Sequence, residues 1–434
     1  MSKLAILGGD AAVTAAAPMW PAVTDEDIAV VTNTLQRSRD DVSNLTSVLA
    51  GGAVAEFEEA AADFFGAPYC ATTNSGGSAL HAALMALDIG VGDEVIVSPY
   101  TWGQSVSCVL QQCAVPVFAD IDARTYTMDP ASVERAITPY TKAIVVPHIY
   151  GLPADMLAIR DVADRNGLKV VEDCAQATGA AIGNARVGTL GDIGCFSIGS
   201  GKQIIGGEGG FLLTADRDTH DRLLLATQHP VRCMTELHSD KLRGLLDTFI
   251  HTYRIHPLAA AICRRQLNDL DAWNAQRQEQ LRQLSDRLVG CPGVEPVYEP
   301  NERLHVYHSY NPTYRPDDLE GLPRQRYIAA LAAEGVPVSA SYVGTPLHLS
   351  RRFVERRGYV GGGLPWSAAQ REITYSPGDC PVAEYRCAEV DLSLFLGANL
   401  YRPAPELLDQ VADAFAKVAA RHGDLIKYDA EVAR

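Results

Sequence analysis

The sequence has no long apolar segment and no excess of basic residues. None of its apolar runs approaches the roughly 18 residues of a membrane-spanning helix, so no membrane span is expected. Lysine and arginine number 37 against 53 aspartates and glutamates, which gives a formal net charge of −16. Because nucleic-acid surfaces concentrate positive charge, this balance argues against a nucleic-acid partner.

Paired cysteines and zinc-type histidine spacings are also missing. The ten cysteines are scattered and none forms a Cys-x-x-Cys pair, which in a chain of 434 residues favours reduced thiols and a cytoplasmic location. Gly8-Gly9-Asp10 interrupts the apolar start of the chain early, so we expect no secretory signal. Histidine pairs such as His305 and His308 lack cysteine or carboxylate companions at zinc spacing, and no metal site is expected.

Two common phosphate-binding motifs are absent. A Walker loop needs a glycine five positions before the Gly201-Lys202 pair and a serine or threonine after it, where this chain has Phe196 and Gln203. The dinucleotide fingerprint lacks its third glycine after Gly8-Gly9, and no strand precedes that pair. Neither kind of site is therefore expected.

From about residue 68 to 215, short β-rich runs alternate with helical patterns. Helices are expected at residues 78–87 and 155–166, and strands at 93–98, 115–120, 142–148, 168–173, 193–198 and 209–214. This alternation predicts an α/β fold with a large, mostly parallel sheet covered on both faces. Ligands bind such sheets at the carboxyl ends of the strands.

A long helix is predicted from Pro257 to about Leu288, with proline in its first turn. A proline-rich stretch follows at residues 292–323, and a last helix is expected at about 406–421. We place a domain boundary inside the long helix. The chain then divides into a large domain with an N-terminal arm, residues 1–265, and a smaller α+β domain, residues 266–434.

One lysine stands out by its surroundings. Lys202 lies among four glycines, Gly199, Gly201, Gly206 and Gly207, which indicate close approach of the backbone to a ligand. A lysine that attacks a carbonyl group must spend time neutral, and enclosure beside a ligand lowers its pKa toward working pH. An isolated lysine is more often a solvated surface residue; the glycines make the functional interpretation the better one here.

Asp173 and Gln176 follow the strand expected at residues 168–173. A carboxylate at that position is suited to keeping a pyridine nitrogen protonated, so that the ring can accept electrons, and an amide three residues on can donate to a ring hydroxyl. A helix cap or a solvated loop is the ordinary alternative for such an aspartate.

Ser75-Gly76-Gly77-Ser78 opens the helix expected at 78–87 and offers hydroxyls and free N–H groups to a phosphate, as does the hydroxyl of Ser197. Trp102 is suited to stacking on an aromatic ring. The alternatives are a plain helix cap and a core tryptophan. Taken together, these residues predict a site for a phosphate-bearing aromatic aldehyde that forms an imine with Lys202.

In this order, the motifs resemble those of the DegT/DnrJ/EryC1/StrS family of pyridoxal-phosphate aminotransferases, whose fold is fold type I, the aspartate aminotransferase-like fold. The resemblance runs from about residue 20 to 420 and is carried by residues 73–80, 92–97, 116–122, 148–151, 172–176, 191–197 and 206–210. Residues 4–9 together with Trp20-Pro21 and residues 25–28 resemble the subgroup that makes aminocyclitols and aminohydroxybenzoate in antibiotic pathways.

The resemblance implies pyridoxal 5'-phosphate as the cofactor and catalytic roles for Lys202, its imine partner, and Asp173, at the pyridine nitrogen. It implies further cofactor contacts from Gly76, Gly77, Ser78, Trp102, Gln176, Ser197 and Thr252. Family members are homodimers whose active sites use residues from both chains.

Three positions depart from the family pattern. Gly201 stands where a threonine usually precedes the lysine, and Thr252-Tyr253-Arg254 stands where the partner-subunit motif is Asn-Tyr-Arg. Residues 38–44 lack a Gly-Arg-Trp-like element, which leaves the substrate class open. Candidates for binding the donor's carboxylate are Arg254, Arg232 and His229, and candidates for acceptor contacts are residues 341–348.

We therefore expect an aminotransferase that moves an amino group from glutamate or glutamine to a ketone on a cyclitol or sugar-like acceptor, in antibiotic metabolism. Lys202 would serve as both imine partner and general acid–base. A lyase, dehydratase or cyclase, including aminohydroxybenzoate synthase-like chemistry, is the alternative on the same residues. Retention of the lysine argues against those family dehydratases that replace it with histidine. A ligand-sensing or scaffold protein is the third possibility.

Overall fold

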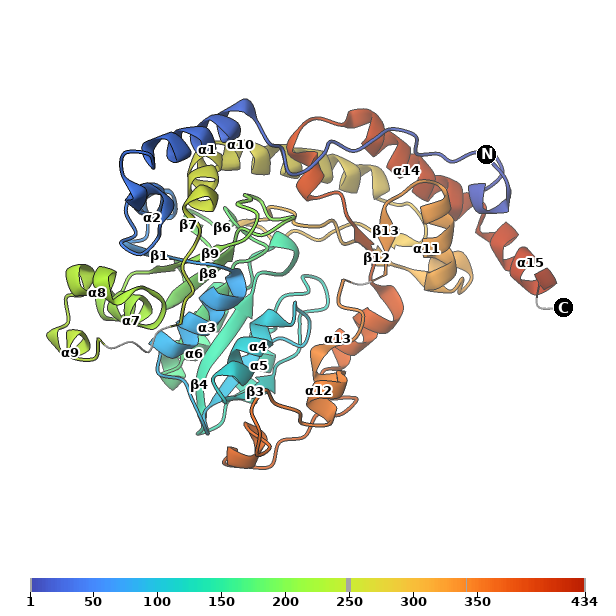
Figure 1. Cartoon of the computed structure of the whole chain (residues 1–434). Coiled ribbons are helices and arrows are strands. Elements are labelled where there is room, and N and C mark those ends of the chain that lie inside the picture. The colour runs from blue at the N-terminus through green and yellow to red at the C-terminus, as the bar shows by residue number, and fades with distance from the viewer. Residues whose placement is uncertain (1, 247–250, 341, 433–434) are drawn as a thin grey trace.

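The computed structural model describes residues 2–246, 251–340 and 342–432 and is built around a seven-stranded sheet (Figure 1). The strand order is β1-β9-β8-β5-β4-β2-β3. Neighbouring strands pair in parallel except β9, which is antiparallel to both β1 and β8. The strands are β1 Tyr69–Thr73, β2 Glu94–Val97, β3 Val115–Phe118, β4 Thr141–Pro147, β5 Lys169–Asp173, β8 Ile193–Ser197 and β9 Gly210–Thr214.

The predicted mostly parallel sheet is confirmed, and each of the six predicted strand segments contains a strand of this sheet. The sequence missed β1, whose residues are Tyr-Cys-Ala-Thr-Thr and show no apolar run. This segment becomes a strand by pairing along its whole length with β9, from Tyr69 opposite Thr214 to Thr73 opposite Gly210. Its structure therefore depends on a partner far along the chain.

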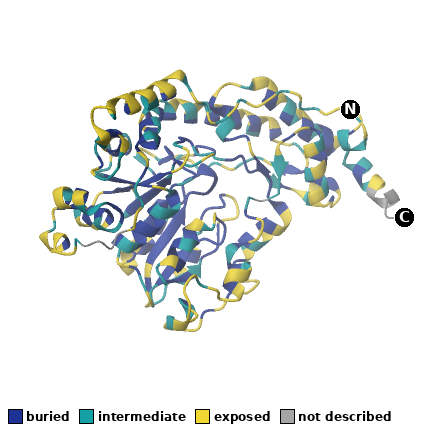
Figure 2. Cartoon of the chain, viewed as in Figure 1, coloured by how far each residue is buried: buried dark blue, intermediate teal, exposed yellow. Residues whose placement is uncertain are grey.

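Alternating side chains of the strands enter different cores, as the two-residue period of a strand requires. Val95 and Val97 of β2 pack with helices on one face, whereas Ile96 packs on the other. The first face is covered by α3 Gly76–Ala86, α4 Gln104–Gln111 and α7 Arg217–Thr227. The other face is covered by α5 Pro130–Ala136 and α6 Met156–Asn166, and by α2 Ala53–Phe65 nearer β8 and β9. The strands are accordingly buried on both sides (Figure 2).

A second core lies beyond the sheet, around α11 Arg324–Ala333 and α14 Pro405–Ala420 (Figure 1). The long helix α10, Pro257–Leu288, has the bounds that the sequence predicts and joins the two cores. Its first half packs with the sheet through residues such as Leu270, and its last turns pack in the second core through residues such as Leu284. His256 caps this helix by accepting a hydrogen bond from the N–H of Leu258.

The remaining elements are short. Small antiparallel sheets are formed by β6 Ala181–Ile182, β7 Ala185–Arg186 and β11 Arg303–Leu304, by β10 Val294–Glu295 and β12 Thr313–Tyr314, and by β13 Val338–Ser339 and β14 Ser393–Leu394. The other α-helices are α1 Asp25–Arg37, α8 Pro230–Glu236, α9 Asp240–Arg243, α12 Arg351–Val354, α13 Pro381–Tyr385 and α15 His422–Val432. Within the described part of the chain, no helix has both the length and the apolar composition needed to cross a membrane.

The first residues of the chain pack on the second core. Leu4 is fully buried there, and the buried carboxylate of Glu334 accepts hydrogen bonds from the N–H groups of Ala5 and Ala12 at 2.8 and 3.0 Å. Lys417 on α14 forms an ion pair with the same carboxylate at 2.8 Å. The N-terminal arm, which the sequence analysis groups with the large domain at residues 1–265, thus contacts the second core, and the division near residue 265 stays a prediction.

We expect Glu334→Ala to lower the free energy of unfolding by about 3–5 kcal/mol, because it leaves the buried Lys417 ammonium without its carboxylate and two partly buried N–H groups without their acceptor. Chemical denaturation, with hydrogen exchange of residues 5–15, measures the effect. Asp413→Ala, which removes an exposed carboxylate from the same helix as Lys417, is the control. Equal denaturation midpoints for the two variants would contradict this account of the arm.

Candidate active site

A cavity opens where strands of the central sheet end. Its wall includes Pro147 and Asp173, the last residues of β4 and β5, and Ser197, the last residue of β8. The start of α3 closes one side of it. This is the edge at which parallel sheets bind ligands. Seven of the predicted site residues lie in the wall: Gly76, Gly77, Trp102, Asp173, Gln176, Ser197 and Lys202.

Asp173 accepts hydrogen bonds from two donors. Ser105 Oγ on α4 donates to Oδ2 at 2.6 Å, and the N–H of Ala175 donates to Oδ1 at 3.1 Å. Thr101 lies within hydrogen-bonding distance of the Ser105 hydroxyl at 2.9 Å, so the contact is part of a small chain. These contacts orient the Asp173 side chain. The sequence did not identify Ser105, because nothing near it in the chain indicates its contact with a residue at the end of a distant strand.

Lys202 follows a short turn after β8. Burial lowers the pKa of its amine, and the nearby charge of Asp173 opposes that change by raising it. Gly201 precedes it with φ +79°, a conformation that L side chains rarely adopt, so the glycine at this position has a conformational reason. The two residues that the sequence selected as catalytic therefore share one partly enclosed space.

His308 lies behind Lys202 and is neutral at working pH. Burial, together with the positive charges of Lys202 and Arg277, lowers the pKa of its imidazole to about 3, although a hydrogen bond with the Gly201 backbone partly opposes this change. The sequence considered His308 only as part of a pair without metal ligands. Its position beside the lysine is a result of the tertiary structure.

Gln176 is oriented by a backbone contact. Its Oε1 accepts a hydrogen bond from the N–H of Tyr150 at 2.7 Å, which leaves Nε2 for the cavity side, where Tyr342 Oη lies 3.4 Å away. Tyr342 also lies beside the exposed ring of Trp102, with ring centroids 6.0 Å apart. It belongs to the predicted acceptor segment at residues 341–348, of which Ser341 lies outside the described residues.

The start of α3 has the form of an anion site. Ser75 caps the helix by accepting from the N–H of Ser78 at 3.0 Å, and the first turn leaves N–H groups of Gly76 and Gly77 free to face the cavity. A Cβ built on Gly76 would lie 2.7 Å from Cβ of Ser197, too close for any side chain. The glycine therefore lets the start of the helix approach Ser197 closely, so that both line the same part of the cavity wall.

Two predicted cofactor residues lie outside this wall. The hydroxyl of Ser78 donates to Asn74 Oδ1 at 2.7 Å, and its remaining contact is with the Ser75 hydroxyl at 2.9 Å. Thr252 is exposed, and its carbonyl oxygen accepts from Asn74 Nδ2 at 3.2 Å. A cofactor contact from Thr252 in a partner's site remains a prediction.

The three candidates for binding the donor's carboxylate differ in availability. Arg232 is buried and engaged with Glu58 at 2.7 Å and Glu236 at 3.0 Å, so it has no role at the cavity. His229 caps α8 by accepting from the N–H of Val231. Nη1 of Arg254 is buried without a hydrogen-bond partner among the described residues, which makes Arg254 the remaining candidate.

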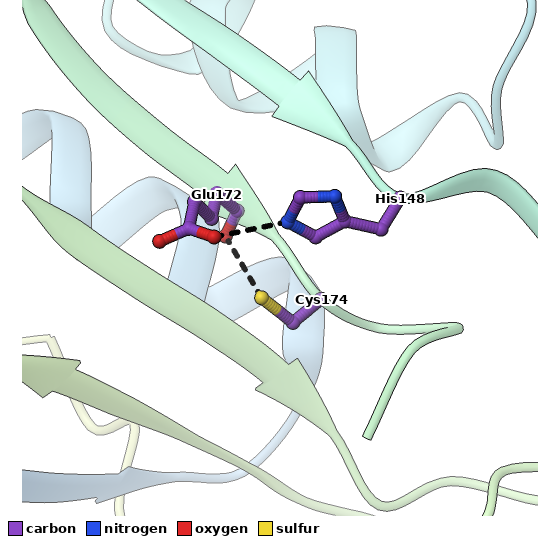
Figure 3. A group of neighbouring side chains, drawn as sticks. All are labelled: His148, Glu172 and Cys174. Atoms are coloured by element: carbon purple, nitrogen blue, oxygen red, sulfur yellow. Dashed lines mark hydrogen bonds and ion pairs between the residues drawn. The ribbon is translucent and has the colours of Figure 1, made fainter. Parts of the chain in front are cut away.

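His148, Glu172 and Cys174 form a fully buried group beneath the cavity (Figure 3). His148 Nδ1 accepts from the N–H of Ala154 at 3.0 Å, so its Nε2 carries the proton and donates to Glu172 at 3.0 Å. Glu172 also accepts from three backbone N–H groups of residues 188–191, at 2.6 to 2.8 Å. Both carboxylate oxygens are thus occupied. These bonds hold Glu172, the residue next to Asp173, in one position. They leave no carboxylate oxygen of Glu172 free to bind a metal.

Comparisons with known proteins agree with this architecture. The model of the DegT/DnrJ/EryC1/StrS aminotransferase family matches residues 32–378. The chain is 34% identical over 433 residues to an L-glutamine:2-deoxy-scyllo-inosose aminotransferase of Streptoalloteichus tenebrarius, covering 97% of this chain and 99% of that relative.

Two solved structures have the same fold. An aminotransferase from Psychrobacter cryohalolentis has a TM-score of 0.80 and 27% identity, covering 94% of this chain and 100% of that one. DesV of S. venezuelae, solved in complex with a ketimine intermediate, has a TM-score of 0.75 and 31% identity, covering 92% and 96%. The chain therefore belongs to the DegT/DnrJ/EryC1/StrS aminotransferase family and has the fold type I architecture expected from its motifs.

Proposed function

We propose that the chain binds pyridoxal 5'-phosphate in this cavity and transfers the amino group of glutamine to a ketone of a cyclitol, in the making of an aminocyclitol antibiotic. The observation that carries the proposal is the meeting of Lys202, Asp173 and the open start of α3 in one cavity. The full-length likeness to a glutamine:2-deoxy-scyllo-inosose aminotransferase supports the choice of donor and acceptor class.

The residues of the cavity fit this cofactor at each of its polar ends. The free N–H groups of α3 and the Ser197 hydroxyl, which the lack of a side chain at Gly76 allows to lie close together, suit a phosphate. Asp173 suits a protonated ring nitrogen, and Gln176 Nε2 suits the ring hydroxyl. When bound, the cofactor supplies an aldehyde that condenses with amines and a ring that withdraws electrons from the adjacent carbon.

Lys202 then has two tasks. Its amine, with a pKa lowered by burial, is available in the neutral form that attacks a carbonyl. Once an amino donor has displaced it, Nζ is the base that removes the proton from the donor's carbon and the acid that returns a proton on the cofactor side. Asp173 would hold a proton on the ring nitrogen, and Ser105 and the N–H of Ala175 orient its side chain for that contact.

The surroundings of the cavity mouth suit a polar substrate. Trp102 and Tyr342 lie at the mouth, one largely exposed and the other with a hydroxyl close to Gln176. Arg254 is the residue proposed for the donor's carboxylate, since its Nη1 has no partner among the residues described. We further propose a cytoplasmic homodimer in which the segment holding Thr252 reaches the partner's site.

Lys202→Ala is expected to lower turnover by about 10⁴-fold, because one amine acts both as nucleophile and as proton carrier. The visible absorbance of the lysine-bound cofactor and its trapping by borohydride should disappear with it. Lys142→Ala, which changes an exposed lysine on β4, is the matched control and should keep both. A Lys202→Ala protein that retained the absorbance band and the turnover would sink the assignment.

Asp173→Asn should lower kcat by about 100- to 1000-fold, because an amide no longer favours a proton on the ring nitrogen. Borohydride trapping on Lys202 should survive, which separates this effect from loss of cofactor binding. Asp63→Asn, at an exposed position on α2, serves as the control. If the asparagine variant turned over at the control's rate, Asp173 would not have the role proposed.

The reaction class is tested with glutamine labelled with ¹⁵N on its α-amino group. We expect the label to appear in the amine of the product when a cyclitol ketone is the acceptor, and glutamine to be preferred to glutamate. Mass spectrometry of the product measures the transfer. Product formation without label would point instead to elimination or cyclisation on the same residues.

A further inference from the structure

The catalytic lysine is contacted by a residue from the N-terminal arm. Trp20 Nε1 donates a hydrogen bond to the carbonyl oxygen of Lys202 at 2.9 Å. The two residues are far apart in the sequence, and Trp20 is not part of the cavity wall. We infer that Trp20 is a positioning residue for Lys202, and that the arm thereby ties the second core to the turn that presents the catalytic amine. The inference rests on the proposed function of Lys202.

The turn around Lys202 is held by a few hydrogen bonds. The N–H of Lys202 bonds to the carbonyl of Gly199 at 3.3 Å, long for such a bond, and His308 bonds to the Gly201 backbone. A Cβ built on Gly201 or Gly207 would meet nothing within 4 Å, so the turn is not packed tightly on these sides. The hydrogen bond from Trp20 to the lysine's own carbonyl adds a contact at the residue from which the amine extends.

Trp20 is itself held in place by three neighbours. Its ring packs edge-on against Trp273 of α10, with centroids 5.3 Å apart, and against Tyr401 at 5.1 Å. The guanidinium of Arg277, a fully buried side chain of α10, lies 4.8 Å from its ring centroid. Aromatic and cation–π contacts of this kind orient an indole ring. These contacts hold the indole N–H of Trp20 in place. The hydrogen bond therefore restricts where the carbonyl of Lys202 can lie.

The arm before Trp20 is fastened to the second core. Asn399 Nδ2 donates to the carbonyl of Pro18 at 2.7 Å, and Gln410 Oε1 on α14 accepts from the N–H groups of Thr14 and Ala15 at 2.7 and 2.8 Å. The arm runs from α14 along α10 toward α1 (Figure 1). A displacement of the second core relative to the sheet is therefore transmitted to Lys202 through a short, bonded segment.

Trp20→Phe is the test, because it keeps an aromatic ring and removes only the N–H donor and part of the ring. Without that donor the lysine's carbonyl is unpaired and the turn loses its anchor. We expect imine formation between the apoprotein and pyridoxal phosphate, followed by absorbance, to slow about tenfold. We also expect kcat to fall by a similar factor with little change in the KM for the acceptor, since Trp20 does not line the cavity.

A readout on the apoprotein makes the test independent of cofactor chemistry. The rate at which an amine-labelling reagent modifies Lys202, mapped by mass spectrometry against pH, reports the state of the amine. The pH midpoint of this labelling should rise by about half a unit in Trp20→Phe. A looser turn would expose the Lys202 amine to water and weaken the burial that lowers its pKa. Trp366→Phe, which loses an indole bond of 3.0 Å to Tyr375 outside the cavity wall, is the matched control and should leave the midpoint unchanged.

The labelling midpoint and the rate of imine formation together decide whether Trp20 positions Lys202. A Trp20→Phe protein that matches Trp366→Phe in labelling midpoint and in imine formation overturns the inference. If Trp20→Phe does not fold, Asn399→Ala is tested by the same two measurements. This change removes the hydrogen bond to the Pro18 carbonyl and leaves the indole intact. A labelling midpoint equal to that of Trp366→Phe would overturn the coupling between the arm and Lys202. A wild-type protein that forms no imine sinks the proposed function instead, and the labelling experiment still tests the contact between Trp20 and Lys202.

Discussion

Burial beside Asp173 sets the state of the Lys202 amine through two opposed effects. Removal from water lowers the pKa of the amine, and the neighbouring carboxylate raises it. The net effect lowers the pKa of the amine, and Ser105 orients the side chain of Asp173 through a hydrogen bond. Both groups reach the same space because β5 and β8 run in parallel and end at one edge of the sheet. The chemistry proposed for the cavity depends on that geometry.

The position of Asp173 depends in turn on the buried carboxylate of its neighbour, Glu172. The carboxylate of Glu172, the preceding residue on β5, is bonded to His148 (Figure 3). It also accepts hydrogen bonds from three backbone N–H groups, so both of its oxygens have partners. A buried carboxylate is costly unless it is fully bonded in this way. Once bonded it holds the strand end in a single arrangement, so the side chain that faces the cavity has little freedom.

The two cores are coupled by more than the continuity of the chain. Helix α10 contributes to both, and the N-terminal arm runs beside it from the second core to Trp20. Glu334 fastens the start of the arm and Trp20 its end. The turn that carries Lys202 thereby receives a contact from Trp20, which lies outside the cavity wall and far from this turn in the sequence.

Elements with local signals could be predicted from the residues alone. Apolar periodicity predicts the strand before Asp173, a proline in the first turn predicts the helix from Pro257 to Leu288, and the freedom of glycine explains the glycines around Lys202. Three other features follow only from the folded chain: β1 is a strand, Ser105 donates to Asp173, and Trp20 donates to the carbonyl of Lys202. These contacts join segments far apart in the chain, and a hydrogen bond between distant residues leaves no periodic pattern in the sequence of either partner.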